Sequence, residues 1–190
     1  MSSAAVAVAG GAAVATLVLV AVVASYNRFV RQHHLVEESW RQVDVELARR
    51  HRLVPDLVAT VRAYAAHERA VLDRVAEAEA TAEQPATVAE RDGAESQLSQ
   101  GLRWLLALGE NHPALRADRH FLALQRQLAE TEDRIAAARR FYNGNVRALN
   151  TRVDSFPSSL VARGARVRRA SYFLVDDAAL RTVPPVARHG

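Results

Sequence analysis

Residues 121–142 read FLALQRQLAETEDRIAAARRFY, a run in which apolar or small side chains recur at alternating steps of three and four residues. This spacing places one stripe on a single face of an α-helix and is typical of the seam of a helical bundle. The stripe consists of Phe121, Leu124, Leu128, Thr131, Ile135, Ala138 and Tyr142, and it slips afterwards to Val146, Leu149, Val153 and Phe156. With Asp118 as the predicted N-cap and Pro157 as the stop, this helix approaches ~60 Å and needs antiparallel neighbours of similar length.

A first helical neighbour is predicted upstream, where another stripe runs at helical spacing. Its members are Val36, Trp40, Val43, Leu47, Val54, Val58, Val61 and Ala65. The stripe has a polar gap around Arg50 and His51, and Pro55 follows without the backbone N–H that a helix interior uses. The gap favours a break at residues 51–55, whereas the preserved phase of the stripe favours a kink. We expect the break.

Two more helices are predicted, at 56–82 and from about 86 to 109, the latter frayed where Arg91, Asp92 and Gly93 follow one another. The chain is 49% hydrophobic but only 6% aromatic, which suits close-packed helices better than a β-sandwich. There is no cysteine, which excludes disulfides and thiolate metal sites. The predicted fold is all-α: a single N-terminal transmembrane helix, then an antiparallel four-helix bundle with a long C-terminal helix and an irregular tail.

The transmembrane helix is predicted from residues 5–25, AVAVAGGAAVATLVLVAVVAS, because no side chain that is charged at neutral pH precedes Arg28. The run from Ala4 to Ser25 reaches ~33 Å as a helix, enough to cross a hydrocarbon core of ~30 Å. A cleavable signal peptide is the rival interpretation, but positive charge normally precedes its apolar core. Here Arg28 and Arg31 follow the core, and a basic flank is normally retained in the cytoplasm. We therefore expect an uncleaved anchor with the N-terminus outside and the bundle in the cytoplasm of a cell membrane.

The expected domains are a transmembrane anchor at 1–27, a helical bundle at 28–157 and a basic, largely irregular tail at 158–190. The tail has six Arg and two Asp, whereas residues 28–82 carry equal numbers of basic and acidic side chains. Basicity confined to the tail argues against a body that binds nucleic acid.

The tail is instead expected at a membrane surface. Arginines near an anionic inner leaflet each contribute ~1 kcal/mol, and neighbouring aromatic rings can dip into the interface. The candidate membrane-surface residues are Arg28, Arg31, Arg163, Arg166, Arg168, Arg169, Tyr172 and Phe173. The alternative for the tail is a solvated or disordered chain end.

Catalytic signatures are missing from the sequence. The chain has seven His, but neither the Glu-x-x-His repeat of di-iron bundles nor His-Glu-x-x-His occurs. Nucleophile elbows and glycine-rich phosphate loops are absent too. We expect the protein not to be an enzyme and to bind no metal or cofactor. We expect Trp40 and Trp104 to pack in the core or between helices rather than line a ligand pocket.

Several motifs in order resemble the LemA family. They are YNRFV at 26–30, WRQVDVEL at 40–47, Arg49 and Arg50, LVPDLV at 53–58, YAAHE at 64–68, ENHP at 110–113, LQRQL at 124–128, TEDRIAAARRFYN at 131–143 and Phe156-Pro157. The resemblance implies a single-span protein with an outside N-terminus and a cytoplasmic antiparallel four-helix bundle, but no agreed reaction. A magnetosome-membrane member of the family hints at membrane organisation. The chain departs from the family pattern at Ala165, where an aromatic is usual, and at Leu174, where an acid is usual.

We therefore expect a non-enzymatic, membrane-anchored scaffold or adaptor. Its expected partners are the anionic inner leaflet and an unidentified protein, with no nucleic acid, and a homo-oligomer is left open. The alternatives are a metal- or small-ligand-binding bundle enzyme, and a secreted or periplasmic bundle released by signal cleavage.

Overall fold

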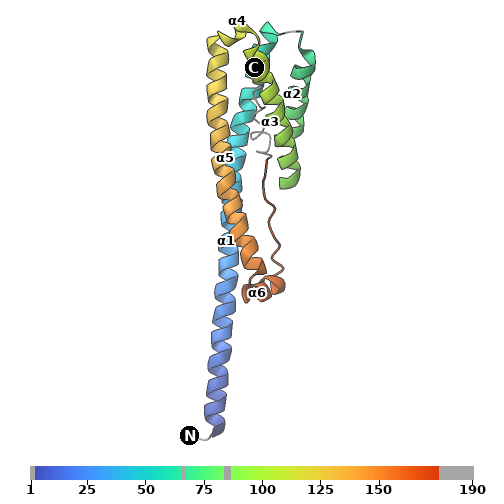
Figure 1. The fold of residues 1–190 in the computed structure, drawn as a ribbon. Coiled ribbons are helices and arrows are strands. Elements are labelled where there is room, and N and C mark those ends of the chain that lie inside the picture. Colours follow the sequence, from blue (N-terminus) through green and yellow to red (C-terminus); the bar gives the residue numbers. More distant parts are fainter. Residues whose placement is uncertain (1–2, 66, 84–86, 176–190) are drawn as a thin grey trace, which may run out of the picture. The chain divides into compact units, whose positions relative to one another are not determined.

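The computed structural model describes residues 3–65, 67–83 and 87–175, with side chains from residue 8 onward. This part of the chain has no strands and six helices (Figure 1): α1 Ser3–Tyr64, α2 Arg69–Ala82, α3 Val88–Glu110, α4 Pro113–Arg116, α5 Arg119–Asp154 and α6 Ser158–Gly164. The predicted all-α class with a long apolar N-terminal helix is confirmed.

The chain forms two compact units, which are described separately. Unit 1 consists of Met1–Arg41 and Phe141–Ala170, and unit 2 consists of Gln42–Arg140 and Ser171–Gly190. The predicted domains end at residues 27 and 157, whereas the compact units are divided after Arg41, Arg140 and Ala170. The predicted division stays a prediction, and α1 runs through residue 27 without interruption.

Unit 2 is the four-helix bundle, built from α2, α3 and the adjoining parts of α1 and α5, with the short α4 as a cap. Short loops join successive helices, so neighbours along the chain run antiparallel. The core takes side chains from every helix, and its fully buried members include Val54, Val61, Leu72, Val75, Leu98, Leu105, Leu115 and Phe121. The seam predicted on α5 is buried as expected at Leu124, Leu128, Thr131 and Ile135.

The predicted break at 51–55 is wrong, because α1 continues through Pro55 to Tyr64. Val54 and Leu57, on either side of the proline, are both buried in the core of unit 2. One missing backbone hydrogen bond costs less than moving these apolar side chains out of register. Instead, α1 ends at Tyr64 and α2 begins at Arg69, so the segment 56–82 is not one helix.

The start of α3 is ordered where fraying was expected. Thr87 and Glu90 form a capping box: the Thr87 hydroxyl accepts from the Glu90 backbone N–H at 3.2 Å, and the Glu90 carboxylate accepts from the Thr87 N–H at 3.0 Å. Two otherwise unbonded amides of the first turn are thereby satisfied, which holds residues 91–93 in the helix. The predicted N-cap at Asp118 is confirmed, since its Oδ1 accepts from the Phe121 N–H at 2.9 Å.

Unit 1 pairs the N-terminal part of α1 with the C-terminal part of α5. Phe29 and Val36 of α1 are buried, as are Tyr142, Val146 and Leu149 of α5. The Trp40 and Tyr142 rings pack with their centroids 5.1 Å apart, so the inter-helix role expected for Trp40 is confirmed. The stripe on α5 ends before Phe156, which is 81% exposed.

Two glycines of α3 give a matched test of this packing. A Cβ at Gly109 would lie 2.8 Å from Cε1 of the buried Phe121 ring, whereas a Cβ at Gly93 would meet nothing within 4 Å. Gly109→Ala should lower the free energy of unfolding by about 1–3 kcal/mol through overpacking. Gly93→Ala should raise it by about 0.5–1 kcal/mol, because alanine loses less backbone entropy in a helix.

Chemical denaturation of the full chain in detergent micelles, followed by circular dichroism, measures both changes. Equal effects of the two substitutions would contradict the close approach of α3 to Phe121.

Candidate functional site

The candidate membrane-surface arginines all lie in unit 1 and all are exposed. Arg28 and Arg31 follow the apolar part of α1, and Arg163 lies in α6. A hollow of about 610 Å³ brings the tail arginines together, and its basic lining residues are Arg163, Arg166, Arg168 and Arg169. Arg169 also pairs with Asp154 at 2.8 Å. The described part of the tail is thus partly helical, and its four arginines line one hollow. Arg181 and Arg188 lie outside the described residues.

The two aromatic candidates belong to unit 2 instead. Phe173 is 0% exposed, so the prediction that its ring dips into a membrane interface is wrong. Asp92 Oδ1 accepts from the backbone N–H of Leu174, at 2.6 Å, and from that of Val175. Arg139 donates to the Val175 carbonyl at 2.7 Å. These bonds hold residues 173–175 against unit 2 and explain the burial of the ring; Tyr172 remains exposed.

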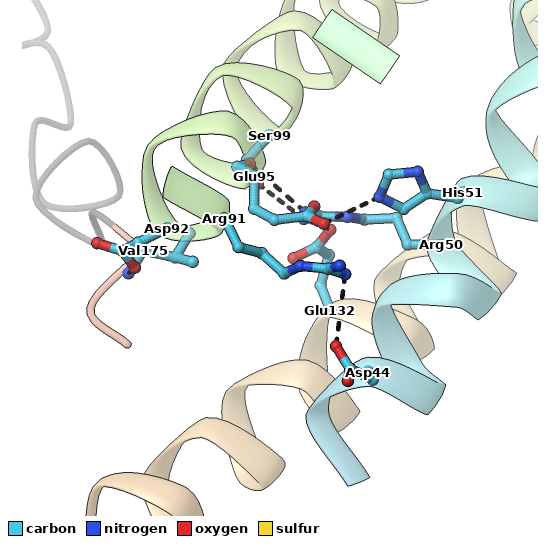
Figure 2. A network of polar contacts seen from close by, with 9 residues as sticks. All are labelled: Asp44, Arg50, His51, Arg91, Asp92, Glu95, Ser99, Glu132 and Val175. Carbon is cyan, nitrogen blue, oxygen red and sulfur yellow. Dashed lines mark hydrogen bonds and ion pairs between the residues drawn. The ribbon is translucent and has the colours of Figure 1, made fainter. Parts of the chain in front are cut away.

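The residues of the polar gap in α1 form a buried network with α3 and α5 (Figure 2). Arg50 is 1% exposed, and its Nη1 donates to Ser99 Oγ at 2.7 Å and to Glu132 Oε1 at 2.8 Å. Its Nη2 donates to the Glu95 carboxylate. His51 Nε2 lies 3.0 Å from Glu95 Oε1. One guanidinium therefore joins three helices of unit 2.

The chain belongs to the LemA family. The LemA family profile matches residues 39–187, most of the chain, and it begins downstream of the apolar part of α1. A search of the curated proteins finds no match. The match confirms the predicted family, and it covers both the buried network and the arginine cluster of the tail.

Neighbouring charges control the ionisation of this LemA-family network. Burial disfavours the Glu95 carboxylate, but the hydrogen bond to His51 and the charge of Arg50 outweigh burial and lower the pKa of Glu95 below its ordinary value. Burial likewise opposes the charge of Arg50, yet Glu132 and Glu95 raise the pKa of the guanidinium. The Glu95 carboxylate and the Arg50 guanidinium are therefore both ionised at neutral pH, and they bond to each other.

Sequence reasoning missed this network because it interpreted Arg50 and His51 as an interruption. Its partner Glu95 falls three residues before Leu98, on the stripe that Leu102 and Leu105 continue. The available signal for a buried ion pair was a basic residue, Arg50, and an acidic residue, Glu95, each on the apolar stripe of a different helix.

The Trp104 ring of α3 is 43% exposed, so of the two expected positions it takes the one between helices, against Arg74 of α2, and not the one in the core. The guanidinium carbon of Arg74 lies 5.5 Å from the ring centroid, in the range of a cation–π contact. Within the described part of the chain, no group of three or more His, Asp or Glu side chains is arranged to hold a metal ion.

Removing the Arg50 guanidinium should destabilise the fold. Arg50→Met leaves the Glu95 carboxylate buried without its cation, so the free energy of unfolding should fall by about 3–5 kcal/mol. Arg49→Met, one residue away and paired with Glu46 at 3.4 Å near the surface, should change it by about 0.5 kcal/mol or less. The double variant Arg50→Met, Glu95→Leu should recover much of the loss. Denaturation in micelles measures all three; equal losses for the two single variants would refute the buried pair.

Stability should also depend on pH through Glu95. Because its folded-state pKa is lowered from 4.5, its contribution is present above that value and is lost as the pH falls through the lower folded-state pKa. The free energy of unfolding should therefore fall below pH 4.5 more steeply in the unsubstituted protein than in Glu95→Gln. Glu110→Gln, exposed on the same helix, is the control and should keep the steep dependence. A denaturation series across pH measures the slopes, and parallel slopes for all three proteins would contradict the assignment.

Proposed function

We propose that this LemA-family protein is a single-pass, membrane-anchored scaffold or adaptor with its N-terminus outside the cell and its helical bundle in the cytoplasm. The observation that carries the proposal is the first part of α1. The apolar window of this helix has a mean hydropathy of 2.3, and none of it is buried within the protein. Large apolar side chains from Val8 to Val23 are exposed on successive turns. A bilayer is the environment in which such a surface is stable.

The orientation follows from charge. Arg28 and Arg31 are exposed immediately after the apolar stretch, and the tail arginines of the same unit are exposed too. Basic residues next to a span are retained on the cytoplasmic side. Both sets therefore favour a cytoplasmic location for the residues that follow the span, where anionic lipids attract them.

A binding role for unit 2 is supported by exposed side chains of the kind that protein interfaces use. Trp104 and Leu122 are large apolar residues that remain exposed on the bundle. Aromatic and aliphatic anchors of this type carry much of the affinity in protein interfaces. The network around Arg50 joins α1, α3 and α5, and its charged groups bond to one another, so the binding role falls to the exposed apolar side chains.

A small-ligand-binding bundle is the second candidate, supported by a cavity of about 270 Å³ in unit 2. Its lining joins charged and polar side chains to an apolar wall that includes Leu102, Leu106 and Ile135. The charged members include Arg50, Arg103, Glu132 and Arg139. Native mass spectrometry and elemental analysis of the purified protein distinguish this candidate from a scaffold, which should carry neither ligand nor metal in unit 2.

Topology tests the anchor. A fluorescent reporter fused to the C-terminus should fold and fluoresce in the cytoplasm. The protein should stay in the membrane pellet after alkaline washing. Its intact mass should include residues 1–27. Arg28→Glu with Arg31→Glu should shift part of the population to the opposite orientation, because the positive flank is lost. A released bundle that lacks residues 1–27 would instead establish the secreted or periplasmic alternative.

The same membranes test the adaptor role. Crosslinking in cells should give a discrete adduct that weakens when Trp104→Ser and Leu122→Ser are combined. Arg134→Gln, an exposed change on α5, serves as the control. An adduct of unchanged strength in the double variant would remove these two side chains from the proposal.

A further inference from the structure

The short helix α6 shares an apolar groove with the end of the apolar stretch of α1, and both belong to unit 1. The groove has a volume of about 550 Å³, and its lining residues are Val22, Val23, Tyr26, Leu160, Val161, Gly164 and Ala165. Leu160 is 60% exposed, and Val22 and Val23 are exposed too. The groove therefore extends the exposed apolar surface of the span onto a second helix, and such a surface is unfavourable in water.

The opposite side of α6 has a different chemistry. Ser159, Ala162 and Arg163 line the basic hollow, and none of the three lines the groove. At helical spacing, positions 160, 161, 164 and 165 lie on one side of a helix, and positions 159, 162 and 163 lie on the other. The helix is thus amphipathic: an apolar side borders the span, and a polar side borders the tail arginines.

The sequence of α1 sets the depth at which the groove lies in a bilayer. Val22 and Val23 belong to the apolar stretch, whereas Arg28 is the first side chain that is charged at neutral pH. Tyr26 lies between them, and tyrosine rings are enriched where the hydrocarbon meets the headgroups. Because the groove contains both valines and the tyrosine, α6 lies at this boundary when α1 spans a membrane.

We infer that α6 is an interfacial helix, with its Leu160 side embedded among acyl chains of the inner leaflet and its Arg163 side directed away from them. These acyl chains are the occupant of the groove. The inference rests on the proposed membrane anchor and adds a second membrane contact to it. A helix of seven residues buries little apolar area by itself. Because α1 already holds α6 at the bilayer, its insertion is intramolecular and needs little affinity of its own.

A second copy of the chain is the rival occupant of the groove. Close helix pairs in membranes use small residues where they touch. The contribution of α1 to the groove is two valines and a tyrosine, whereas its glycine pair, Gly10 and Gly11, lies about three turns away. Flexible acyl chains can fill a groove between branched side chains without a matching surface. Continuity with the exposed surface of the span therefore favours lipid.

The test uses the absence of cysteine from the chain, so that single cysteines report on individual positions of the full protein. Leu160→Cys and Gly164→Cys probe the groove side, Ser159→Cys and Arg163→Cys probe the hollow side, and Leu17→Cys is the reference in the span. A Cβ at Gly164 meets nothing within 4 Å, so this position tolerates a side chain.

Each variant is labelled with an environment-sensitive fluorophore and reconstituted in phosphatidylcholine vesicles, which carry no net charge and leave apolar insertion as the driving force. Lipids brominated on their acyl chains should quench the labels at 17, 160 and 164 several-fold more than those at 159 and 163. Iodide in the water should quench the labels in the reverse order.

A carboxylate placed on either side of α6 gives a matched test of the insertion. Leu160→Asp puts a charge among the acyl chains, so the label at residue 164 should lose most of its quenching by brominated lipid and become accessible to iodide. Ser159→Asp adds the same charge on the hollow side, and the label at 164 should stay embedded. Leu160 is exposed in the protein itself, so its replacement should leave unit 1 folded, which circular dichroism checks.

The reference label keeps the two proposals apart. No quenching by brominated lipid at residue 17 would overturn the membrane anchor. Quenching at 17 but not at 160 and 164, equal quenching on both sides of α6, or quenching at 164 that Leu160→Asp leaves unchanged would overturn the interfacial helix alone. Labels at 160 and 164 that neither quencher reaches, with energy transfer between differently labelled copies, would assign the groove to a second copy and would also overturn it.

Discussion

The buried guanidinium of Arg50 is the interaction on which the bundle depends. A charge taken out of water must be matched by partners of opposite sign, and Glu95 from α3 and Glu132 from α5 supply them. These partners can meet Arg50 only if α1 is helical at residue 50 and keeps its face towards α3 and α5. The same requirement explains why Pro55 does not end α1: the helix on both sides of the proline is fixed, by Arg50 before it and by Leu57 and Val61 after it.

The sequence allowed the helices to be predicted where the decisive contacts are local. The stripe on α5, the cap at Asp118 and the length of the apolar stretch in α1 follow from spacing and side-chain chemistry within one segment. The end of α1 at Tyr64 and the start of α2 at Arg69 could not be predicted in this way, because no Gly or Pro lies between them. Its position depends on how far α1 must run to cover the core residues of its neighbours.

In the candidate site, too, the features set by local sequence could be predicted and those set by distant contacts could not. Clustering of the tail arginines could be anticipated, since four of them fall within seven residues. The burial of Phe173 could not be, because its position depends on Asp92 in α3, about 80 residues earlier in the chain. The family usually has an acid where this chain has Leu174. Here the backbone amides of Leu174 and Val175 donate to Asp92, so the attachment does not depend on the side chain at position 174.

The other departure from the family pattern bears on the membrane. Position 165 is usually aromatic in the family, but here it is alanine and lines the apolar groove together with Gly164. A ring at this position adds volume that alanine lacks, so two small residues in succession leave the space beside Leu160 and Val22 open. In the sequence, the two small residues are flanked by Arg163 and Arg166, which line the basic hollow on the other face of α6. Four consecutive residues, 163–166, thus contribute apolar space on one face of α6 and positive charge on the other.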